Sequence, residues 1–265
     1  MNYDFDKKLD RRNTGCVKWD LNKQLFGRKD VLPMWVADMD IEAPPEVTDA
    51  LRERVEHAAY GYTFGTDSLK EAVAGWEQNR HGWKVEKDWI MFCPGIVPAI
   101  NFFIKCFTHK NDGIIVQTPV YYPFMNSVNF NRRRLVNNQL KEIEGRYKIN
   151  FELLEKQASD PSVKMMLISS PHNPAGKVFS KNELLNMGNI CRRNGVLLIS
   201  DEIHQDVVYH PFEHICTSSL SEEISKNTIT CIAPSKTFNL AGLAFSAIII
   251  PDENIREKFS AYMST

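Results

Sequence analysis

The 265-residue sequence predicts an α/β fold, a three-layer domain in which a mostly parallel sheet is covered by helices. Two observations lead to this prediction. From about residue 89 onward, short apolar runs alternate with segments of helical periodicity. Some of these runs, such as V-L-L-I-S at 196–200, are almost continuously apolar, which is typical of parallel strands buried on both faces. Ligands in such folds bind beyond the carboxyl ends of the strands, so the residues that follow each strand are the first candidates for a functional site.

The N-terminal part of the chain has less regular patterning. Residues 1–45 show little periodicity, as expected of an arm that lies across another surface. Residues 45–59 form a predicted helix with one apolar face, and an aromatic, turn-rich loop follows at 60–67. Ser68 and Glu71 have the spacing of a capping box, which predicts Ser68 as the N-cap of the next helix.

The segments after residue 89 are assigned from their apolar patterns. Strands are expected at 89–93, 113–118, 134–140, 163–169, 196–200, 229–233 and 245–250. Helices are expected at 98–107, within 119–131, at 151–157, at 180–193 and from 252 onward. Ser180 and Glu183 predict a capping box at the start of the helix at 180–193, and Gly195 marks its end.

The composition indicates a globular protein with a large core, because 43% of the residues are hydrophobic. The formal net charge of −1 argues against a nucleic-acid partner. No apolar run approaches the roughly 20 residues that cross a bilayer, and the polar N-terminus does not resemble a signal peptide. The six cysteines have no metal-ligand spacing, so no metal site is expected, and their scatter suggests a reducing, cytoplasmic setting.

Two of the predicted strands are followed by turns that could hold a ligand. A glycine turn at Gly95 enters a helix, and free N–H groups at Gly95, Ile96 and Val97 would suit a phosphate, although a plain tight turn fits the same residues. Tyr121 follows the strand at 113–118, where its ring could stack on a flat ligand or could be an ordinary half-buried tyrosine.

Three further strand ends carry polar residues. Asn173, in the run S-P-H-N-P-A-G, is either a turn asparagine or a hydrogen-bond donor to a ligand oxygen. Asp201 directly follows an apolar strand, where a carboxylate needs a cationic partner unless it is a helix N-cap. Lys236 follows the apolar run 229–233. Taken alone it would be a surface lysine, and the alternative is a lysine that forms a Schiff base with a carbonyl group.

One ligand accounts for all of these positions: pyridoxal 5'-phosphate, a flat cationic heterocycle with a phosphate and an aldehyde. Asp201 would hold the ring nitrogen protonated, and Tyr121 would cover the ring face. Asn173 would contact the phenolic oxygen, the turn at Gly95 would take the phosphate, and Lys236 would bond to the aldehyde.

The chain also resembles a known family over nearly its whole length. It is similar to the fold-type I pyridoxal-phosphate enzymes, and within them to the cystathionine β-lyase (C–S lyase) branch of the class I/II aminotransferases, the MalY/PatB-like proteins. The resemblance implies a large domain of the PLP-dependent transferase type. The motifs that carry it are P-M-W-V-A-D-M-D (33–40), Y-G-Y-T (60–63), P-G-I-V-P-A-I (94–100), T-P-V-Y-Y-P-F (118–124), S-S-P-H-N-P-A-G (169–176), S-D-E-I-H (200–204) and A-P-S-K-T-F-N-L-A-G (233–242).

The resemblance implies further roles for individual residues. Tyr62 would reach the cofactor phosphate of a partner subunit, so the active unit would be a symmetric homodimer. His204 would contact the cofactor, and Ser235 would contact its phosphate. Many aminotransferases carry an arginine eight positions after the lysine. Ala244 stands there in this chain, which favours the lyase branch.

The resemblance also sets the expected domain limits. Residues 1–45 would form an N-terminal arm and part of a small domain, and residues 46–250 the cofactor-binding large domain. Residues 251–265 would begin a linker helix to the rest of the small domain. The family continues past this point and supplies there an arginine for the substrate carboxylate, so the small domain is expected to be incomplete in this chain.

The implied activity is β-elimination from cystathionine or a related S-substituted cysteine to a thiol, pyruvate and ammonia. Lys236, Asp201 and Tyr121 would be the catalytic residues, and the partner would be a small-molecule amino-acid substrate. Two alternatives stay open: aminotransfer between an amino acid and a 2-oxo acid, and a regulatory protein that binds the cofactor without turnover. A nicotinamide oxidoreductase is disfavoured, because no dinucleotide glycine fingerprint follows an early strand.

Overall fold

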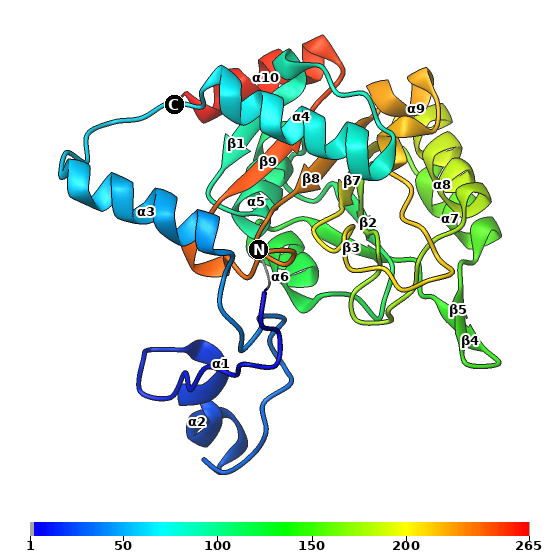
Figure 1. Cartoon of the computed structure of the whole chain (residues 1–265). Helices are drawn as coiled ribbons and strands as arrows, with labels where there is room; N and C mark the ends of the chain where they lie inside the picture. The colour runs from blue at the N-terminus through cyan, green and yellow to red at the C-terminus, as the bar shows by residue number, and fades with distance from the viewer. Residues whose placement is uncertain (1–2, 265) are drawn as a thin grey trace. The chain divides into compact units, whose positions relative to one another are not determined.

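The computed structural model describes residues 3–264, which divide into two compact units (Figure 1). The large unit consists of Phe64–Ala233 together with residues 245–264. The small unit consists of residues 3–63 together with Pro234–Ala244. A short stretch late in the sequence, which includes Lys236, therefore belongs to the same unit as the N-terminal arm.

A seven-stranded sheet, in the order β1-β9-β8-β7-β6-β2-β3, organises the large unit. All neighbouring strands pair in parallel except β9, which is antiparallel to both β1 and β8. The predicted mostly parallel sheet is confirmed. Its strands are β1 (Ile90–Cys93), β2 (Gly113–Val116), β3 (Arg134–Asn137), β6 (Val163–Ser169), β7 (Leu197–Asp201), β8 (Thr228–Ile232) and β9 (Ser246–Ile249).

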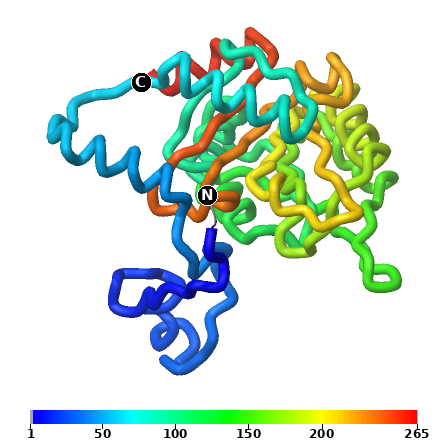
Figure 2. Tube along the Cα trace, viewed as in Figure 1, coloured from blue at the N-terminus to red at the C-terminus, as the bar shows by residue number. Residues whose placement is uncertain are grey.

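Helices cover both faces of this sheet, and Figure 2 traces the chain through the crossovers between the parallel strands. On one face Ile114 packs in a cluster with Phe103 and Phe124, and on the other face Ile115 packs with Leu154 and Met187. Because successive strand residues point to opposite faces, both faces need apolar residues, which explains the continuous apolar runs. The helices are α4 (Asp67–His81), α5 (Ile96–Phe107), α6 (Tyr122–Phe130), α7 (Phe151–Ala158), α8 (Lys181–Arg193), α9 (Glu222–Lys226) and α10 (Glu253–Met263).

Some elements of the large unit were not expected from the sequence. The run predicted as one strand at 134–140 ends at Asn137, and an antiparallel hairpin of β4 (Lys141–Ile143) and β5 (Arg146–Lys148) follows. All residues of β4 are exposed, so no apolar pattern marks this strand. The short helix α9 and the 3₁₀ turns were also missed. These turns are η1 (Lys87–Trp89) and η2 (Thr217–Ser219) in the large unit and η3 (Ala241–Leu243) in the small one.

The two predicted capping boxes have different outcomes. The box at the start of α8 is confirmed, because the Ser180 hydroxyl accepts from the Glu183 N–H and the Glu183 side chain accepts from the Ser180 N–H. The prediction for α4 was wrong, because the N-cap is Thr66, whose hydroxyl accepts from Leu69 N–H at 3.3 Å. Ser68 lies inside this helix. Two hydroxyl residues two positions apart compete for the cap, and the first of them holds it.

The small unit contains α1 (Val17–Asp20), α2 (Asn22–Phe26) and α3 (Pro45–His57). The helix predicted at 45–59 is confirmed, and it begins with proline at its first turn, where the missing N–H is least costly. The two short helices within residues 1–45 were not expected. None of the residues of α3 is buried, and its apolar residues Leu51 and Val55 are exposed. None of the helices in the described residues is long and apolar enough to cross a membrane.

The packing of the large unit predicts opposite effects for alanine at two helical glycines. A Cβ on Gly188 of α8 would lie 2.9 Å from the Ile224 side chain, whereas a Cβ on Gly75 of α4 would have no neighbour within 4 Å. Gly188→Ala should therefore destabilise the protein by about 1 kcal/mol or more through overpacking. Gly75→Ala should stabilise it by about 0.5–1 kcal/mol through lower backbone entropy. Chemical denaturation of both variants checks this, and a stabilising Gly188→Ala would contradict the packing.

Candidate functional site

The carboxyl ends of β2, β6 and β7 bring together three of the residues singled out in the sequence. These strands are direct neighbours and run parallel, and Ser169 at the end of β6 pairs with Asp201 at the end of β7. Beyond the ladder, Ser170 N–H donates to the Asp201 carbonyl at 2.8 Å. Tyr121 N–H donates to the Asn173 carbonyl at 2.9 Å. The loops that carry Tyr121, Asn173 and Asp201 are therefore held together by main-chain hydrogen bonds.

The loop of Asn173 is held by side chains that the sequence reading did not single out. Ser169 Oγ accepts from the Asn173 N–H at 3.2 Å and donates to the Pro171 carbonyl at 3.0 Å. The buried His172 places its Nε2 2.7 Å from the Pro119 carbonyl, so this nitrogen carries the proton. Burial lowers the pKa of His172, which keeps the ring neutral. Ser169 thus braces the loop after β6 from within, and His172 ties this loop to the loop after β2.

Asp201 is a buried carboxylate, with 6% of the residue exposed. It is the last residue of β7, and a turn follows it instead of a helix, so the N-cap alternative is wrong. Its Oδ1 accepts from Ile203 N–H at 3.1 Å. Burial, followed by the charges of Tyr122 and Asp201, raises the pKa of Tyr121. The raised pKa keeps the phenol protonated at neutral pH.

Gly95 is the N-cap of α5 and has a φ of 134°, in the region that favours glycine. No side chain caps this helix. The N–H groups of Ile96 and Val97 have no intrahelical acceptor, because they belong to the first turn. Two N–H groups and the positive end of the helix dipole therefore meet at this turn, as the phosphate-site interpretation requires.

His204 lies in the turn after β7, three residues beyond Asp201. It is partly buried, and its carbonyl accepts from Val207 N–H at 2.9 Å. The turn belongs to the large unit, like Tyr121, Asn173 and Asp201.

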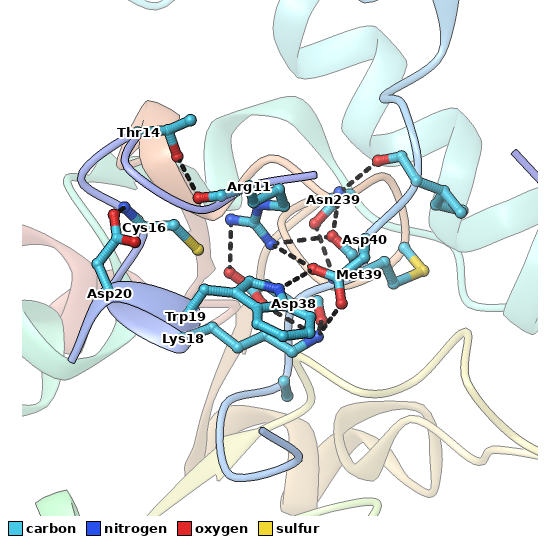
Figure 3. A network of polar contacts seen from close by, with 12 residues as sticks. Arg11, Thr14, Cys16, Lys18, Trp19, Asp20, Asp38, Met39, Asp40 and Asn239 are labelled. Carbon is cyan, nitrogen blue, oxygen red and sulfur yellow. Dashed lines mark hydrogen bonds and ion pairs between the residues drawn. The ribbon is translucent and has the colours of Figure 1, made fainter. Parts of the chain in front are cut away.

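Lys236 and Ser235 belong to the small unit. The Lys236 amine donates to the Ala37 carbonyl at 2.8 Å, although the two residues are 199 positions apart in the sequence. The Ser235 carbonyl accepts from Leu240 N–H at 3.0 Å, which closes the loop after the lysine. Tyr62, in the same unit, has a fully exposed side chain. Figure 3 shows the polar network around Asp38, Met39 and Asp40, which includes Asn239 from this loop.

A buried polar cluster lies directly after Asp201 in the sequence and was also missed. Glu202 accepts from Ser200 Oγ at 2.7 Å and from Thr217 N–H at 3.0 Å, and its other oxygen lies 2.8 Å from His214 Nε2. Glu202 directly follows Asp201, the last residue of β7. The contact between Glu202 and His214 therefore holds the end of this strand in place.

The same cluster could offer metal ligands from Glu202, His214 and Cys216, whose ligand atoms lie within 4.8 Å of one another. Both oxygens of Glu202 already accept hydrogen bonds. Burial and nearby carboxylates raise the pKa of the Cys216 thiol, whereas metals bind the thiolate. The Cys216 thiol donates to Glu77 at 3.5 Å. These bonds favour a hydrogen-bonded ion pair at this place over a metal centre.

The Glu202–His214 pair predicts a pH-dependent contribution to stability. Burial raises the pKa of Glu202, but the charge of His214 and the hydrogen bonds outweigh it, so the net pKa lies below the ordinary 4.5. A carboxyl group with a lowered folded-state pKa contributes stability above its unfolded pKa, and the contribution is lost as the pH falls through the folded value. Glu202→Gln should therefore cost about 3 kcal/mol at neutral pH, because it leaves His214 without its buried partner.

Denaturation of this variant and of the wild type at pH values from 7 down to 3 checks the prediction. The difference between them should shrink below pH 4.5. The exposed Glu222→Gln provides the control, with an expected change within about 0.5 kcal/mol at each pH. A Glu202→Gln effect that is independent of pH would contradict the ion pair.

The protein has a three-layer α/β fold with polar groups at the carboxyl edge of its sheet. In folds of this class, ligands bind at that edge. The chain belongs to the family of aminotransferase class I and II, whose model matches residues 15–264. It is 49% identical over 257 residues to cystathionine beta-lyase PatB of Bacillus subtilis (strain 168), and the match covers 97% of this chain and 66% of that protein. It is 31% identical over 263 residues to protein MalY of Escherichia coli (strain K12), covering 99% and 66%. The family resemblance read from the motifs is thereby confirmed.

Solved structures with the same fold also include proteins that bind pyridoxal phosphate. The crystal structure of cystalysin from Treponema denticola, described as containing a pyridoxal 5'-phosphate cofactor, has a TM-score of 0.95 and 40% identity, covering 100% of this chain and 68% of that one. The PLP-bound C-S lyase from Staphylococcus hominis has a TM-score of 0.90 and 34% identity, covering 98% and 66%. A PLP-bound putative aminotransferase from Clostridium difficile 630 has a TM-score of 0.95 and 42% identity, covering 99% and 68%. The chain spans about two thirds of the length of the curated relatives that it matches.

Proposed function

We propose that this protein is a pyridoxal-phosphate-dependent carbon–sulfur lyase. The reaction is β-elimination from cystathionine or a related S-substituted cysteine, which yields a thiol, pyruvate and ammonia. The observation that carries the proposal is the buried Asp201 carboxylate at the carboxyl edge of a parallel sheet, where main-chain hydrogen bonds join its strand end to the loops of Asn173 and Tyr121. The name of the relative at 49% identity, a cystathionine beta-lyase, and that of the related C-S lyase structure support it, as does the cofactor named for cystalysin.

The residues of the large unit have the chemistry that this cofactor needs. A buried carboxylate such as Asp201 is stabilised by a cation, and the protonated ring nitrogen of the cofactor would be that cation. The neutral phenol of Tyr121 offers a flat apolar face for the ring. The N–H groups of Ile96 and Val97, at the start of α5, offer two donors and a helix dipole for the phosphate.

The roles of the single residues follow from these properties. When bound, pyridoxal phosphate supplies an electron sink for the carbanion at the substrate Cα. Asp201 would keep the proton on the ring nitrogen, and Asn173 would donate to the phenolic oxygen. His204 would contact the cofactor, and Ser235 would donate to its phosphate. Lys236 would hold the cofactor covalently and, once released, take the proton from the substrate Cα.

The proposal extends to the assembly of the protein. The substrate is a small-molecule amino acid, which fits the family. We propose a symmetric homodimer in which Tyr62, whose side chain is fully exposed, reaches the cofactor phosphate of the partner subunit. We propose that residues 1–45 form an N-terminal arm and part of a small domain, that residues 46–250 form the cofactor-binding large domain, and that residues 251–265 begin a linker helix. The free thiols of all six cysteines fit a cytoplasmic location.

Replacing the lysine tests the covalent role. Lys236→Ala should abolish both the visible absorbance of the bound cofactor and the production of pyruvate from cystathionine, because no other group would replace its amine. Absorbance spectra of the purified protein with pyridoxal phosphate and a coupled pyruvate assay measure the two effects. Lys226→Ala provides the control, because that amine is exposed and pairs with Glu222 on the surface. Retained turnover in Lys236→Ala would refute the assignment.

Asp201 has a separate role that a second variant tests. Asp201→Asn keeps the size of the side chain but cannot hold the ring nitrogen protonated, so turnover should fall by about a hundredfold or more. The visible absorbance should remain, because Lys236 is intact. A pyruvate assay beside an absorbance spectrum separates the two effects, and an Asp201→Asn variant with wild-type turnover would argue against the pairing.

Aminotransfer is the second candidate, favoured by the matched family and by the related structure described as a putative aminotransferase. Both reactions begin with loss of the Cα proton and differ in whether a group leaves from Cβ. Incubation with cystathionine alone should release pyruvate and a thiol. A requirement for added 2-oxo acid, with no pyruvate from cystathionine, would favour the aminotransferase. Bound cofactor with neither product would favour a regulatory protein.

A further inference from the structure

Lys236 and Asn239 lie in one loop of the small unit, within Pro234–Ala244, which we call the lysine loop. The amide group of Asn239 joins this loop to the N-terminal arm (Figure 3). Its Oδ1 accepts from Met39 N–H at 3.0 Å. Its Nδ2 donates to the Met39 carbonyl at 3.0 Å and to the Ile41 carbonyl at 2.9 Å. Asn239 and Met39 are 200 positions apart in the sequence. We call these three hydrogen bonds the Asn239 clamp.

The arm segment that the clamp grips is itself held by charged groups that are buried or partly buried. Arg11 donates to the Asp38 carboxylate at 3.0 Å and to the Met39 carbonyl at 3.0 Å. Lys18, of which 8% is exposed, donates to Asp40 at 2.9 Å and to the Asp38 carbonyl at 3.0 Å. Burial alone would raise the pKa of Asp40, but hydrogen bonds from Trp19 and Lys18 and the lysine charge lower it overall. The segment is therefore a stiff support.

The Lys236 amine bonds to this same support. The Ala37 carbonyl, which accepts from Lys236 at 2.8 Å, lies two residues before Met39. Lys236 lies three residues before Asn239, so two links join one short loop to one short arm segment. A lysine has a long flexible stem, and its amine is held at one place only if its acceptor is held.

The backbone at Asn239 fits this role. Its φ is 58°, in the left-handed region that asparagine adopts more readily than most residues. Asparagine therefore supplies both the turn and the amide. Glycine would keep the turn and remove only the amide.

We propose that Asn239 is a positioning residue for Lys236: by tying the loop of Lys236 to residues 39 and 41 of the arm, it keeps the lysine amine at the Ala37 carbonyl, where the amine rests before the cofactor is captured. This role rests on the proposed function of Lys236. Loss of the clamp releases the loop of Lys236 from this support, and the amine is then held less firmly at the Ala37 carbonyl. Its reaction with small reagents in solution becomes faster, while its capture of pyridoxal phosphate, with loss of water, becomes slower.

The test compares Asn239→Gly with a matched control, Asn13→Gly. Asn13 is also an asparagine of the small unit with a left-handed backbone, at φ 59°, but it is exposed and its side chain makes none of the hydrogen bonds found in the described residues. Asn239→Asp is the second variant, because it keeps the acceptor for Met39 N–H and loses both donated bonds. It serves if the glycine variant does not fold.

The first measurement needs no cofactor. Each protein is treated with acetic anhydride, and the acetylation rate at Lys236 is read by mass spectrometry, with Lys177 of the large unit as internal reference. Asn239→Gly should acetylate Lys236 about fivefold faster than the wild type, the effect expected from the loss of a hydrogen-bonded support. Lys177 should not change, and Asn13→Gly should behave as the wild type. Equal rates at Lys236 in Asn239→Gly and the wild type would overturn the proposal.

The second measurement uses pyridoxal phosphate and borohydride, which traps the cofactor on the amine that has captured it. Capture at Lys236 should be about tenfold slower in Asn239→Gly, because more than one supporting hydrogen bond is lost. Faster acetylation with unchanged capture would mean that Asn239 serves stability alone, and would overturn the positioning role. Absence of capture by the wild type would refute the proposed function, whereas the acetylation rates would still decide on the clamp.

Discussion

The pairing of β6 with β2 on one side and with β7 on the other is the constraint on which the candidate site depends. Parallel ladders in register bring the ends of these strands to one edge, so that Ser169 stands opposite Asp201. The hydrogen bonds from Ser170 to Asp201 and from Tyr121 to Asn173 continue the pairing into the loops. A shift in register by one residue would turn the buried Asp201 to the opposite face of the sheet.

Buried or partly buried charges support the proposed functional residues in both units. In the large unit the Glu202–His214 pair anchors the chain just after Asp201. In the small unit Arg11 and Lys18 hold Asp38 and the rest of the segment to which Lys236 donates. Removing one member of a buried ion pair costs more than the pair itself contributes, because the remaining charge stays in a poorly solvated place. The functional residues are therefore held in place by groups that take no part in the chemistry.

Much of the fold and of the large-unit site could be predicted, because both follow from local pattern. Continuous apolar runs reveal parallel strands, and the residues after such strands gather at one edge, which is why Tyr121, Asn173 and Asp201 could be predicted to lie on neighbouring loops. The cap of α4 was misplaced because Thr66 and Ser68 are both good caps. The hairpin of β4 and β5 was missed because β4 is exposed throughout and has no buried face to reveal it.

The missed contacts are mostly those between distant residues. The partner of Glu202, His214, comes 12 positions later, and Asn239 meets Met39 across 200 positions, so no local pattern marks either pair. His172 was overlooked although it stands inside the motif that contains Asn173, because a histidine between prolines signals a turn as readily as an anchor. The roles of all the site residues toward a cofactor stay predictions, since they depend on a bound group; this holds for Tyr121, Asn173 and Asp201 as well as for Lys236, Ser235, His204 and Tyr62.

A crystal structure of the chain grown with pyridoxal phosphate tests the central claim most directly. The account predicts continuous electron density from the Lys236 amine to the cofactor, with Asp201 within hydrogen-bond distance of the ring nitrogen and Tyr121 against the ring face. Cofactor density joined to a different lysine, or a ring nitrogen with no carboxylate beside it, would contradict the account.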